Sequence, residues 1–426
     1  MSNQHSDRAV VLGGSVAGMM AAAALAQRYT SVTVVERDIL PQDTGGAHRR
    51  GVPQGRHVHG LQPQGRRIVE ELLPGFTERV LTAGGHQGDI LGNTRWYLNG
   101  LPLRQAHTGL AALSASRPLL EGSIRDLTLA LPNVTLLDGH DVVGVCANDG
   151  GGRVTGARVT SLHGGGSRVM PADLVVDATG RGSRAPRWLA DLGLPGPAEE
   201  EVRIDLAYTS RVFDVPDELF DGDIVVVTAR FPGQHRSAVM QRLEGGRALV
   251  TLAGVHGERA PADLAGFTAY AESLPVSATA DVVRAATPVG DAVAFRYPTY
   301  VRRRYERLAT VPEGLLVLGD AACAFNPVYG QGMSVAAMCA GALRTSVEPA
   351  AFFAAQAALL DAPWTLAVRA DVEGPSEPMR RLQLAAVHDA ELAEAFIRVT
   401  SLVDPPSALF APWIAERLSA PAPTSV

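Results

Sequence analysis

The sequence predicts an α/β fold (α+β mixed), with a parallel-sheet domain, an inserted antiparallel β-sheet domain and a helical C-terminal tail. Two observations carry this prediction. Residues 8–37 read as an apolar strand, a glycine turn, an Ala-rich helix and a second apolar strand ending in an acid, which is the start of a Rossmann-type unit. Residues 199–310 show short alternating runs separated by glycine turns, which is typical of antiparallel sheets.

The glycine turn after the first strand has the composition of a dinucleotide-binding loop. Gly13 permits a tight turn, Ser15 is small enough for a pyrophosphate to approach the backbone, and Gly18 lets the helix pack against the sheet. Glu36 follows about 20 residues later, where a carboxylate binds ribose hydroxyls. An ordinary βαβ unit without a ligand is the alternative. A nucleophile elbow around Ser15 is disfavoured, because it needs a glycine where Ala17 stands.

Composition excludes several classes of protein. The 426 residues are 46% hydrophobic and 19% charged, as expected for a soluble globular enzyme. The net charge of −6 gives no general attraction to nucleic acid. We expect no membrane span, no signal peptide and a cytoplasmic location. All 38 basic residues are arginine, which excludes Schiff-base lysines, a P-loop lysine and lysine-dependent halogenation.

The remaining elements follow from apolar runs and from turn residues. Helices are expected at residues 66–73, 116–130, 261–273, 280–286 and 335–343, and over most of 349–426. Strands are expected at residues 133–146, 153–161, 174–176, 202–212, 224–228, 238–243, 247–252 and 315–318, with a hairpin at 88–104. The arginine run at residues 302–304 is predicted to be exposed to solvent.

Polar side chains of possible chemical use lie in the loop after Glu36. Arg49, Arg50 and Arg56 are of the type that binds phosphates bidentately. His57 and His59 have a spacing that occurs in metal sites, but no acidic or cysteine partner is close in sequence, so no metal is expected.

Two further motifs end strands in glycine-containing turns. Residues 172–184, ADLVVDATGRGSR, place Arg181 and Arg184 beside such a turn, and we interpret it as a second cofactor contact. Residues 315–343 run from a strand through Asp320 and a Gly-rich segment into a helix. An acid at the carboxyl end of a parallel strand can bind ribityl or ribose hydroxyls. The helix N-terminus favours a developing negative charge.

Three motifs in fixed order, GGSVAG with Glu36, DLVVDATGRGSR and LLVLGDAACAFNPVYGQGMS, resemble those of FAD-dependent monooxygenases of the aromatic-hydroxylase-like superfamily. The resemblance covers about residues 8–343. The stretches RRGVPQGRHVHGLQPQG and NPVYGQGMS look most like flavin epoxidases of bacterial polyether and polyketide biosynthesis. We expect a discontinuous FAD-binding domain at residues 1–75, 105–190 and 305–345. A β-rich substrate domain is expected at residues 76–104 and 191–304, and a C-terminal helical region at residues 346–426.

The resemblance implies which residues would hold FAD. The pyrophosphate would lie at the first glycine turn, the adenosine ribose at Glu36, the ribityl part near Arg117 and Asp320, and the isoalloxazine at residues 327–334. The expected cofactor-binding residues are Gly13, Gly14, Ser15, Ala17, Gly18, Glu36, Arg37, Arg56, Arg117, Gly319, Asp320, Pro327, Gly330, Gly332, Met333 and Ser334. DATGRGSR departs from the family's commoner aspartate-glycine form. Because the sequence has no second complete glycine fingerprint, we expect electrons from a transiently docked NAD(P)H or from a separate flavin reductase.

The implied activity is transfer of one oxygen atom of O2, from a C4a-hydroperoxyflavin, to an apolar natural product. The substrate would be polyketide-like or terpenoid, free or carrier-bound, and alkene epoxidation in secondary metabolism, such as antibiotic biosynthesis, fits best. Tyr208, Arg296 and Tyr297 are the candidate pocket residues, and no base for phenol chemistry stands in a known place. Aromatic hydroxylation, flavin-dependent alkene reduction and non-catalytic FAD binding remain alternatives. Flavin halogenases would need a lysine and a Trp-x-Trp-x-Ile-Pro segment, and both are absent.

Overall fold

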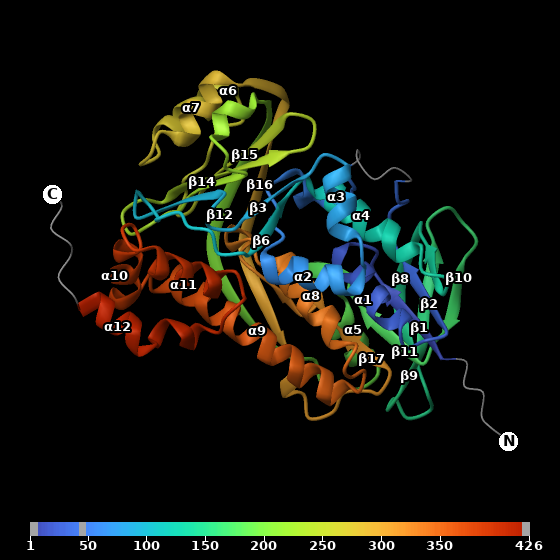
Figure 1. Cartoon of the computed structure of the whole chain (residues 1–426). Coiled ribbons are helices and arrows are strands. Elements are labelled where there is room, and N and C mark those ends of the chain that lie inside the picture. The colour runs from blue at the N-terminus through green and yellow to red at the C-terminus, as the bar shows by residue number, and fades with distance from the viewer. Residues whose placement is uncertain (1–6, 42–47, 420–426) are drawn as a thin grey trace, which may run out of the picture.

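The computed structural model describes residues 7–41 and 48–419. The parts of the predicted FAD-binding and C-terminal segments at residues 1–6, 42–47 and 420–426 lie outside this description. Figure 1 shows a parallel sheet with its helices, a large and mainly antiparallel sheet standing above it, and a group of C-terminal helices beside both. The predicted mixed fold with a helical C-terminal region is confirmed.

The Rossmann-type sheet has five parallel strands in the order β17-β11-β1-β2-β7. They are β1 (Arg8–Leu12), β2 (Ser31–Val35), β7 (Val134–Leu137), β11 (Leu174–Asp177) and β17 (Leu315–Val317). Helix α1 (Val16–Ala26) packs against α4 (Arg117–Leu129) and α8 (Gly332–Ala342). The strands are apolar because the sheet is covered, as parallel sheets require. The turns after β1, β11 and β17 therefore meet at one edge.

The large sheet has the order β18-β16-β12-β15-β14-β13-β4-β5. Its strands are β4 (Thr94–Leu98), β5 (Leu101–Pro102), β12 (Ala198–Asp214), β13 (Val225–Thr228), β14 (Arg236–Leu243), β15 (Arg247–Gly254), β16 (Thr287–Arg304) and β18 (Cys323–Ala324). The long strands β12 and β16 pair along most of their length and reach from the region of the parallel sheet to α6 (Leu264–Glu272) and α7 (Ala278–Ala285) (Figure 1).

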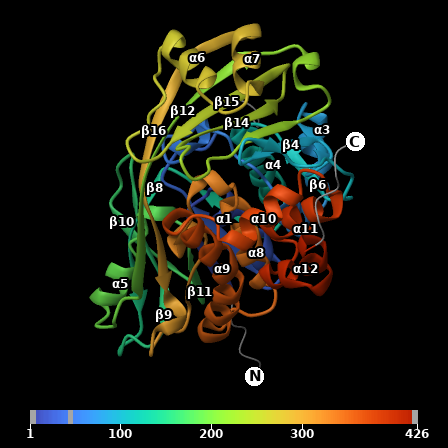
Figure 2. The same ribbon diagram turned by 90° about the vertical axis from the view of Figure 1, so that its left-hand side faces the viewer.

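Smaller elements complete the two halves. β3 (His86–Asp89) pairs with β6 (Ala111–Ser114), and β8 (His140–Ala147), β9 (Val154–Ser161) and β10 (Ser167–Pro171) form a three-stranded sheet. The remaining helices are α2 (Pro63–Leu72), α3 (Phe76–Thr82), α5 (Ala185–Asp191), α9 (Pro349–Val372), α10 (Glu377–Ala385), α11 (Ala390–Thr400) and α12 (Pro412–Ser419). Figure 2 shows α9 to α12 gathered on one side of the molecule, below the large sheet.

Helix α9 is, in the described part of the chain, the one helix whose length and composition reach those of a membrane-spanning helix. It packs against α8 and β17 and buries Phe352, Leu360 and Trp364. Pro363 also lies inside it. Such packing is typical of a core helix of a globular fold, which passes the same test of length and composition.

Two sequence-based predictions are corrected by the structure. The strand predicted at residues 133–146 is two strands in different sheets, because the chain turns at Gly139, whose φ is +62°. The arginine run is not exposed: Arg302 is fully buried and Arg304 is 9% exposed. Both lie at the end of β16, a strand that was not predicted. Helix α9 covers them, and Asp361 on that helix pairs with Arg302 at 2.7 Å and with Arg304 at 3.2 Å. The predicted domain boundaries stay predictions.

Candidate functional site

A cavity of about 1660 Å³ joins the three parts of the fold. Its walls come from the turns of the parallel sheet, from one face of the large sheet and from helices α9 to α11. Pockets for one small ligand usually measure about 300–1,000 Å³. The cavity is therefore large enough for a dinucleotide together with a second molecule.

The first glycine turn forms one end of the cavity. Gly13 has a φ of +101°, and a Cβ there would lie 2.5 Å from the carbonyl oxygen of Ala178. At Gly18 a Cβ would lie 1.8 Å from the Gly13 carbonyl oxygen. Ser15 is the N-cap of α1, but its side chain does not cap the helix. The first-turn amides of α1, which have no intrahelical acceptor, therefore receive none from the N-cap side chain either, and this suits an anionic ligand.

A buried network of charges lies beside this turn. Glu121 binds Arg49 at 2.6 Å and Arg117 at 2.9 Å, and it accepts a hydrogen bond from the Ser15 hydroxyl at 3.1 Å. Arg117 Nη2 donates to the Ser15 Oγ at 3.0 Å. Burial acts to raise the pKa of Glu121, but the two arginines outweigh it, so this pKa lies below its ordinary value. Cationic groups thus stand next to free helix amides.

Glu36 continues the network towards the second strand. One oxygen of its carboxylate accepts from the Gly14 amide at 2.7 Å, and the other accepts from the Asp38 amide at 2.9 Å. Arg49 lies 3.3 Å from the same carboxylate, and its buried Nε has no hydrogen-bond partner among the described residues. The glycine turn at Gly13 and the unused Nε of Arg49 fit the pyrophosphate of a dinucleotide such as FAD, and the Glu36 carboxylate fits its ribose.

The turn after β11 is held by its own aspartate. Asp177 accepts hydrogen bonds from the Thr179 amide at 2.9 Å and from the Thr179 and Ser183 hydroxyls at 2.6 and 2.5 Å. This rigid turn aims Arg181 at the cavity, where its guanidinium lies 4.5 Å from the ring centre of Tyr297 and donates to the Thr299 hydroxyl at 2.7 Å.

The third motif brings an acid and a short segment to the same cavity. Asp320 lines it, and burial raises the pKa of this carboxyl although Arg117 and Arg181 oppose the shift. Residues 326–334 follow, with Gly330 in the left-handed region at a φ of +63°. Gln62, the N-cap of α2, holds this segment from one side. Its side-chain amide donates to the Tyr329 carbonyl oxygen at 3.3 Å, and its backbone amide donates to the Ser334 hydroxyl at 3.1 Å.

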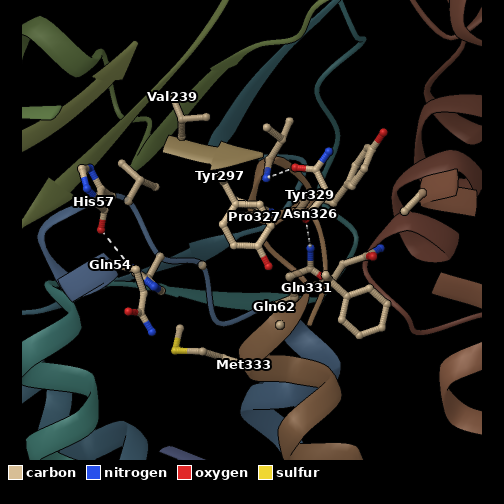
Figure 3. A pocket seen from close by; sticks show the side chains of 18 of the residues that line it. Gln54, His57, Gln62, Val239, Tyr297, Asn326, Pro327, Tyr329, Gln331 and Met333 are labelled. Carbon is tan, nitrogen blue, oxygen red and sulfur yellow. Dashed lines mark hydrogen bonds between the residues drawn. The ribbon is translucent and has the colours of Figure 1, made fainter. Parts of the chain in front are cut away.

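The predicted pocket residues Tyr208, Arg296 and Tyr297 fall on two different faces of the large sheet, because successive side chains of a strand point to opposite faces. Tyr208 pairs with Phe295 and Leu206 with Tyr297, so both tyrosines lie on the face of the sheet that lines the cavity. Figure 3 shows Tyr297 projecting between His57 and the segment that carries Tyr329. Arg296 points to the opposite face, is exposed and does not line the cavity. Burial raises the pKa of both Tyr208 and Tyr297, so the phenols stay neutral.

His57 and His59, which the sequence had suggested only as improbable metal ligands, line the cavity together with His140, His235 and His256. His57 Nδ1 lies 2.8 Å from the Ser210 hydroxyl, which in turn lies 2.6 Å from the Thr251 hydroxyl. Burial, with His48 and Arg56 nearby, lowers the pKa of His57 to about 4. Burial and Arg117 lower the pKa of His59 to about 3. Both imidazoles are therefore neutral near pH 7.

Most of the predicted cofactor-binding residues meet in this one cavity. Those that line it are Gly13, Ser15, Ala17, Glu36, Arg37, Arg117, Asp320, Pro327, Gly330, Gly332 and Met333. Those that do not line it are Gly14, Gly18, Arg56, Gly319 and Ser334. Glu121 was missed by sequence reasoning, although its position four residues after Arg117 on one helix was a usable signal for an ion pair.

Comparisons with known proteins agree with this geometry. Residues 9–188 match the sequence profile described as FAD dependent oxidoreductase. The chain is 36% identical over 360 residues to Protein Rv3254 of Mycobacterium tuberculosis, strain ATCC 25618 / H37Rv, covering 80% of this chain and 73% of that protein.

Solved structures show the same fold at low identity. PqsL, a probable FAD-dependent monooxygenase from Pseudomonas aeruginosa, is similar with a TM-score of 0.65 and 19% identity, over 92% of this chain and 99% of PqsL. A triple mutant of the flavin-dependent brominase Bmp2 is similar with a TM-score of 0.67 and 15% identity, over 93% and 95% of the two chains. The fold is that of FAD-binding monooxygenases, and membership of the matched family supports FAD as the cofactor. The chain belongs to the family of FAD-dependent oxidoreductases.

Proposed function

We propose that the protein is an FAD-dependent monooxygenase that transfers one oxygen atom of O2 to a carbon–carbon double bond of an apolar natural product. The observation that carries the proposal is the shared cavity, in which a dinucleotide cradle opens directly into an apolar chamber. FAD, when bound and reduced, would supply the chemistry that activates O2. The protein would bind the cofactor, orient the substrate and exclude water.

In this proposal the three motifs hold successive parts of FAD. The free amides of α1, together with Arg117 and Arg49, would bind the pyrophosphate, and Glu36 would accept hydrogen bonds from the adenosine ribose. Asp320 would bind the ribityl section. The isoalloxazine would lie between residues 327–334 and the two tyrosines of the large sheet.

The lowered pKa values of two histidines of the cavity, His57 and His59, favour epoxidation over phenol hydroxylation. A phenol is activated by a base whose pKa lies near the working pH. The pKa values of His57 and His59 are lowered to about 4 and about 3, which makes both poor bases at pH 7. An alkene needs no such base. Tyr208 and Tyr297 have no hydrogen-bond partner for their hydroxyls among the described residues, so they would donate to an oxygen of the substrate and orient it.

The walls of the chamber support a large apolar substrate. Side chains from β4, β13 and the C-terminal helices make the wall: Trp96, Leu98, Val225, Val227, Leu366, Met379, Phe396 and Leu409. Such a surface suits a polyketide-like or terpenoid molecule better than a charged aromatic acid. We propose NAD(P)H or a separate flavin reductase as the source of electrons, a free or carrier-bound substrate and a cytoplasmic site of action.

The test is turnover of the FAD-loaded enzyme under labelled oxygen gas with a panel of apolar alkenes and phenols. The proposal expects one labelled oxygen atom in an epoxide, or in a diol or cyclic ether derived from it. A labelled catechol from a phenol, with the alkenes inert, would show an aromatic hydroxylase. A reduced double bond without oxygen consumption would show an alkene reductase, and bound FAD that transfers nothing would show a non-catalytic protein.

A further inference from the structure

An aspartate of the C-terminal helices forms hydrogen bonds to the loop between β18 and α8. Asp371 stands in the last turn of α9, and its side chain is only 1% exposed. One carboxylate oxygen accepts a hydrogen bond from the Tyr329 hydroxyl at 2.7 Å and also binds the Arg230 guanidinium. The other oxygen accepts from the Asn326 amide nitrogen at 2.9 Å. The carboxylate therefore joins three separate parts of the chain.

Both loop residues that Asp371 binds also shape the loop itself. Asn326 is 1% exposed, and its Oδ1 accepts a hydrogen bond from the Val328 amide at 3.1 Å. Tyr329 precedes Gly330, where the chain turns in the left-handed region before α8 begins. Figure 3 shows Asn326, Tyr329 and Gln331 together on one side of the cavity, opposite His57. Asp371 thus acts on both ends of the short turn that leads into α8.

A second contact ties the same loop to the C-terminal region. Gln331 is 5% exposed, and its side-chain amide donates to the Thr400 carbonyl oxygen at 3.0 Å, at the end of α11. On its other side the loop is held by Gln62. The segment is therefore clamped between α2 and the C-terminal helices, and Asp371, which also pairs with Arg230, supplies the negative charge of this clamp.

We propose that Asp371 is a positioning residue that fixes residues 326–333 relative to the flavin, so that the C-terminal helices and the flavin environment respond to one another. The placement of the flavin at this segment rests on the proposed function. The contacts of Asp371 do not. A carboxylate that accepts bonds from Tyr329, Asn326 and Arg230 fixes the segment better than a neutral group, because bonds to charged acceptors are shorter and stronger.

The test compares Asp371→Asn with the unaltered protein. Asparagine keeps the size of the side chain but turns an amide NH2 towards donors, so at least one of the three bonds is lost. In the FAD-free protein, hydrogen exchange of the backbone amides of residues 326–335 should become faster by about tenfold. In the FAD-loaded protein, the flavin absorption spectrum and midpoint potential should shift. Tyr329→Phe, which removes one donor only, should give the same changes at smaller size.

Asp389→Asn is the matched control. Asp389 is also a carboxylate of the C-terminal region that binds an arginine, Arg417, and caps α11, but it does not line the cavity. This variant should leave the exchange rate and the flavin spectrum unchanged. Unchanged exchange in both Asp371→Asn and Tyr329→Phe would overturn the proposal. Faster exchange with an unaltered spectrum and potential would also overturn it, since the segment would then not govern the flavin. Failure of oxygen transfer to alkenes would refute the proposed reaction alone.

Discussion

Gly13→Ala should separate the steric role of the first glycine turn from the general cost of a left-handed residue. An alanine Cβ would lie 2.5 Å from the Ala178 carbonyl oxygen, whereas ordinary contacts begin near 3.4 Å. The strand end or the turn after β11 must therefore move by about 1 Å. Gly109→Ala is the control, because Gly109 has a φ of +74° with nothing within 4 Å and does not line the cavity.

The expected magnitudes differ between the two variants. Both should lose about 1–2 kcal/mol of unfolding free energy from the left-handed backbone. Only Gly13→Ala should lose a further amount of about 1–3 kcal/mol from overpacking. Displacement of the free amides of α1 should also cost FAD affinity. Losing one hydrogen bond from an amide to a phosphate costs about 1.5–3 kcal/mol, which is about ten- to a hundredfold or more in affinity.

The assay is a titration of each FAD-free variant with FAD, followed by flavin fluorescence, together with denaturant unfolding of the FAD-free proteins. Gly109→Ala should bind FAD like the unaltered protein. The reasoning is refuted if Gly13→Ala binds FAD within about twofold of Gly109→Ala and unfolds at the same denaturant concentration.

Three further outcomes follow from the site. Glu121→Gln should lower the unfolding free energy of the FAD-free protein by about 3–5 kcal/mol in denaturant titrations, because it leaves buried arginine charge unpaired; an equal stability would contradict the buried network. Burial lowers the pKa of His57 to about 4, below the unfolded value of about 6.5, so the unfolded chain binds the proton more tightly between these pH values. The unfolding free energy should fall by up to about 3 kcal/mol as the pH drops from about 6.5 to 4, and His57→Asn should flatten this decline; parallel pH profiles would refute the assignment. Arg296→Ala should keep kcat and KM within about twofold, because Arg296 is exposed on the far face of the sheet. A large loss of kcat/KM would show that Arg296 acts in the pocket after all.

Local sequence was sufficient to predict those features whose elements are adjacent in the chain. The strand, glycine turn and helix at residues 8–26 are adjacent in sequence, and the structure has them as β1, the Gly13 turn and α1. The hairpin of β14 and β15 around Gly245 is local in the same way. Each of these features depends on apolar runs and on glycines that adopt a positive φ, both of which are visible in one short window.

Local sequence failed where strand pairing decides the environment. The arginine run at residues 302–304 looks like a solvated stretch, but it lies in β16, between β12 and β18. Burial of Arg302 is made possible by Asp361, which is distant in sequence and reaches it from α9. The same pairing separates Tyr297 from Arg296. Without knowing that residues 287–304 form a strand, no rule tells which of two neighbours faces the cavity.

The C-terminal helices carry the part of the site that the sequence could least reveal. Their sequence matches no chemical motif, so sequence reasoning could assign them no chemistry. Asp371 gains its role only because α9 ends beside Asn326 and Tyr329. A buried carboxylate is costly unless it is paired, and here three donors from two other parts of the chain pair it. The helices therefore do more than cover the chamber. Any movement of α9 away from the loop that leads into α8 must break the hydrogen bonds of Asp371. The C-terminal region therefore cannot open without disturbing the proposed flavin site.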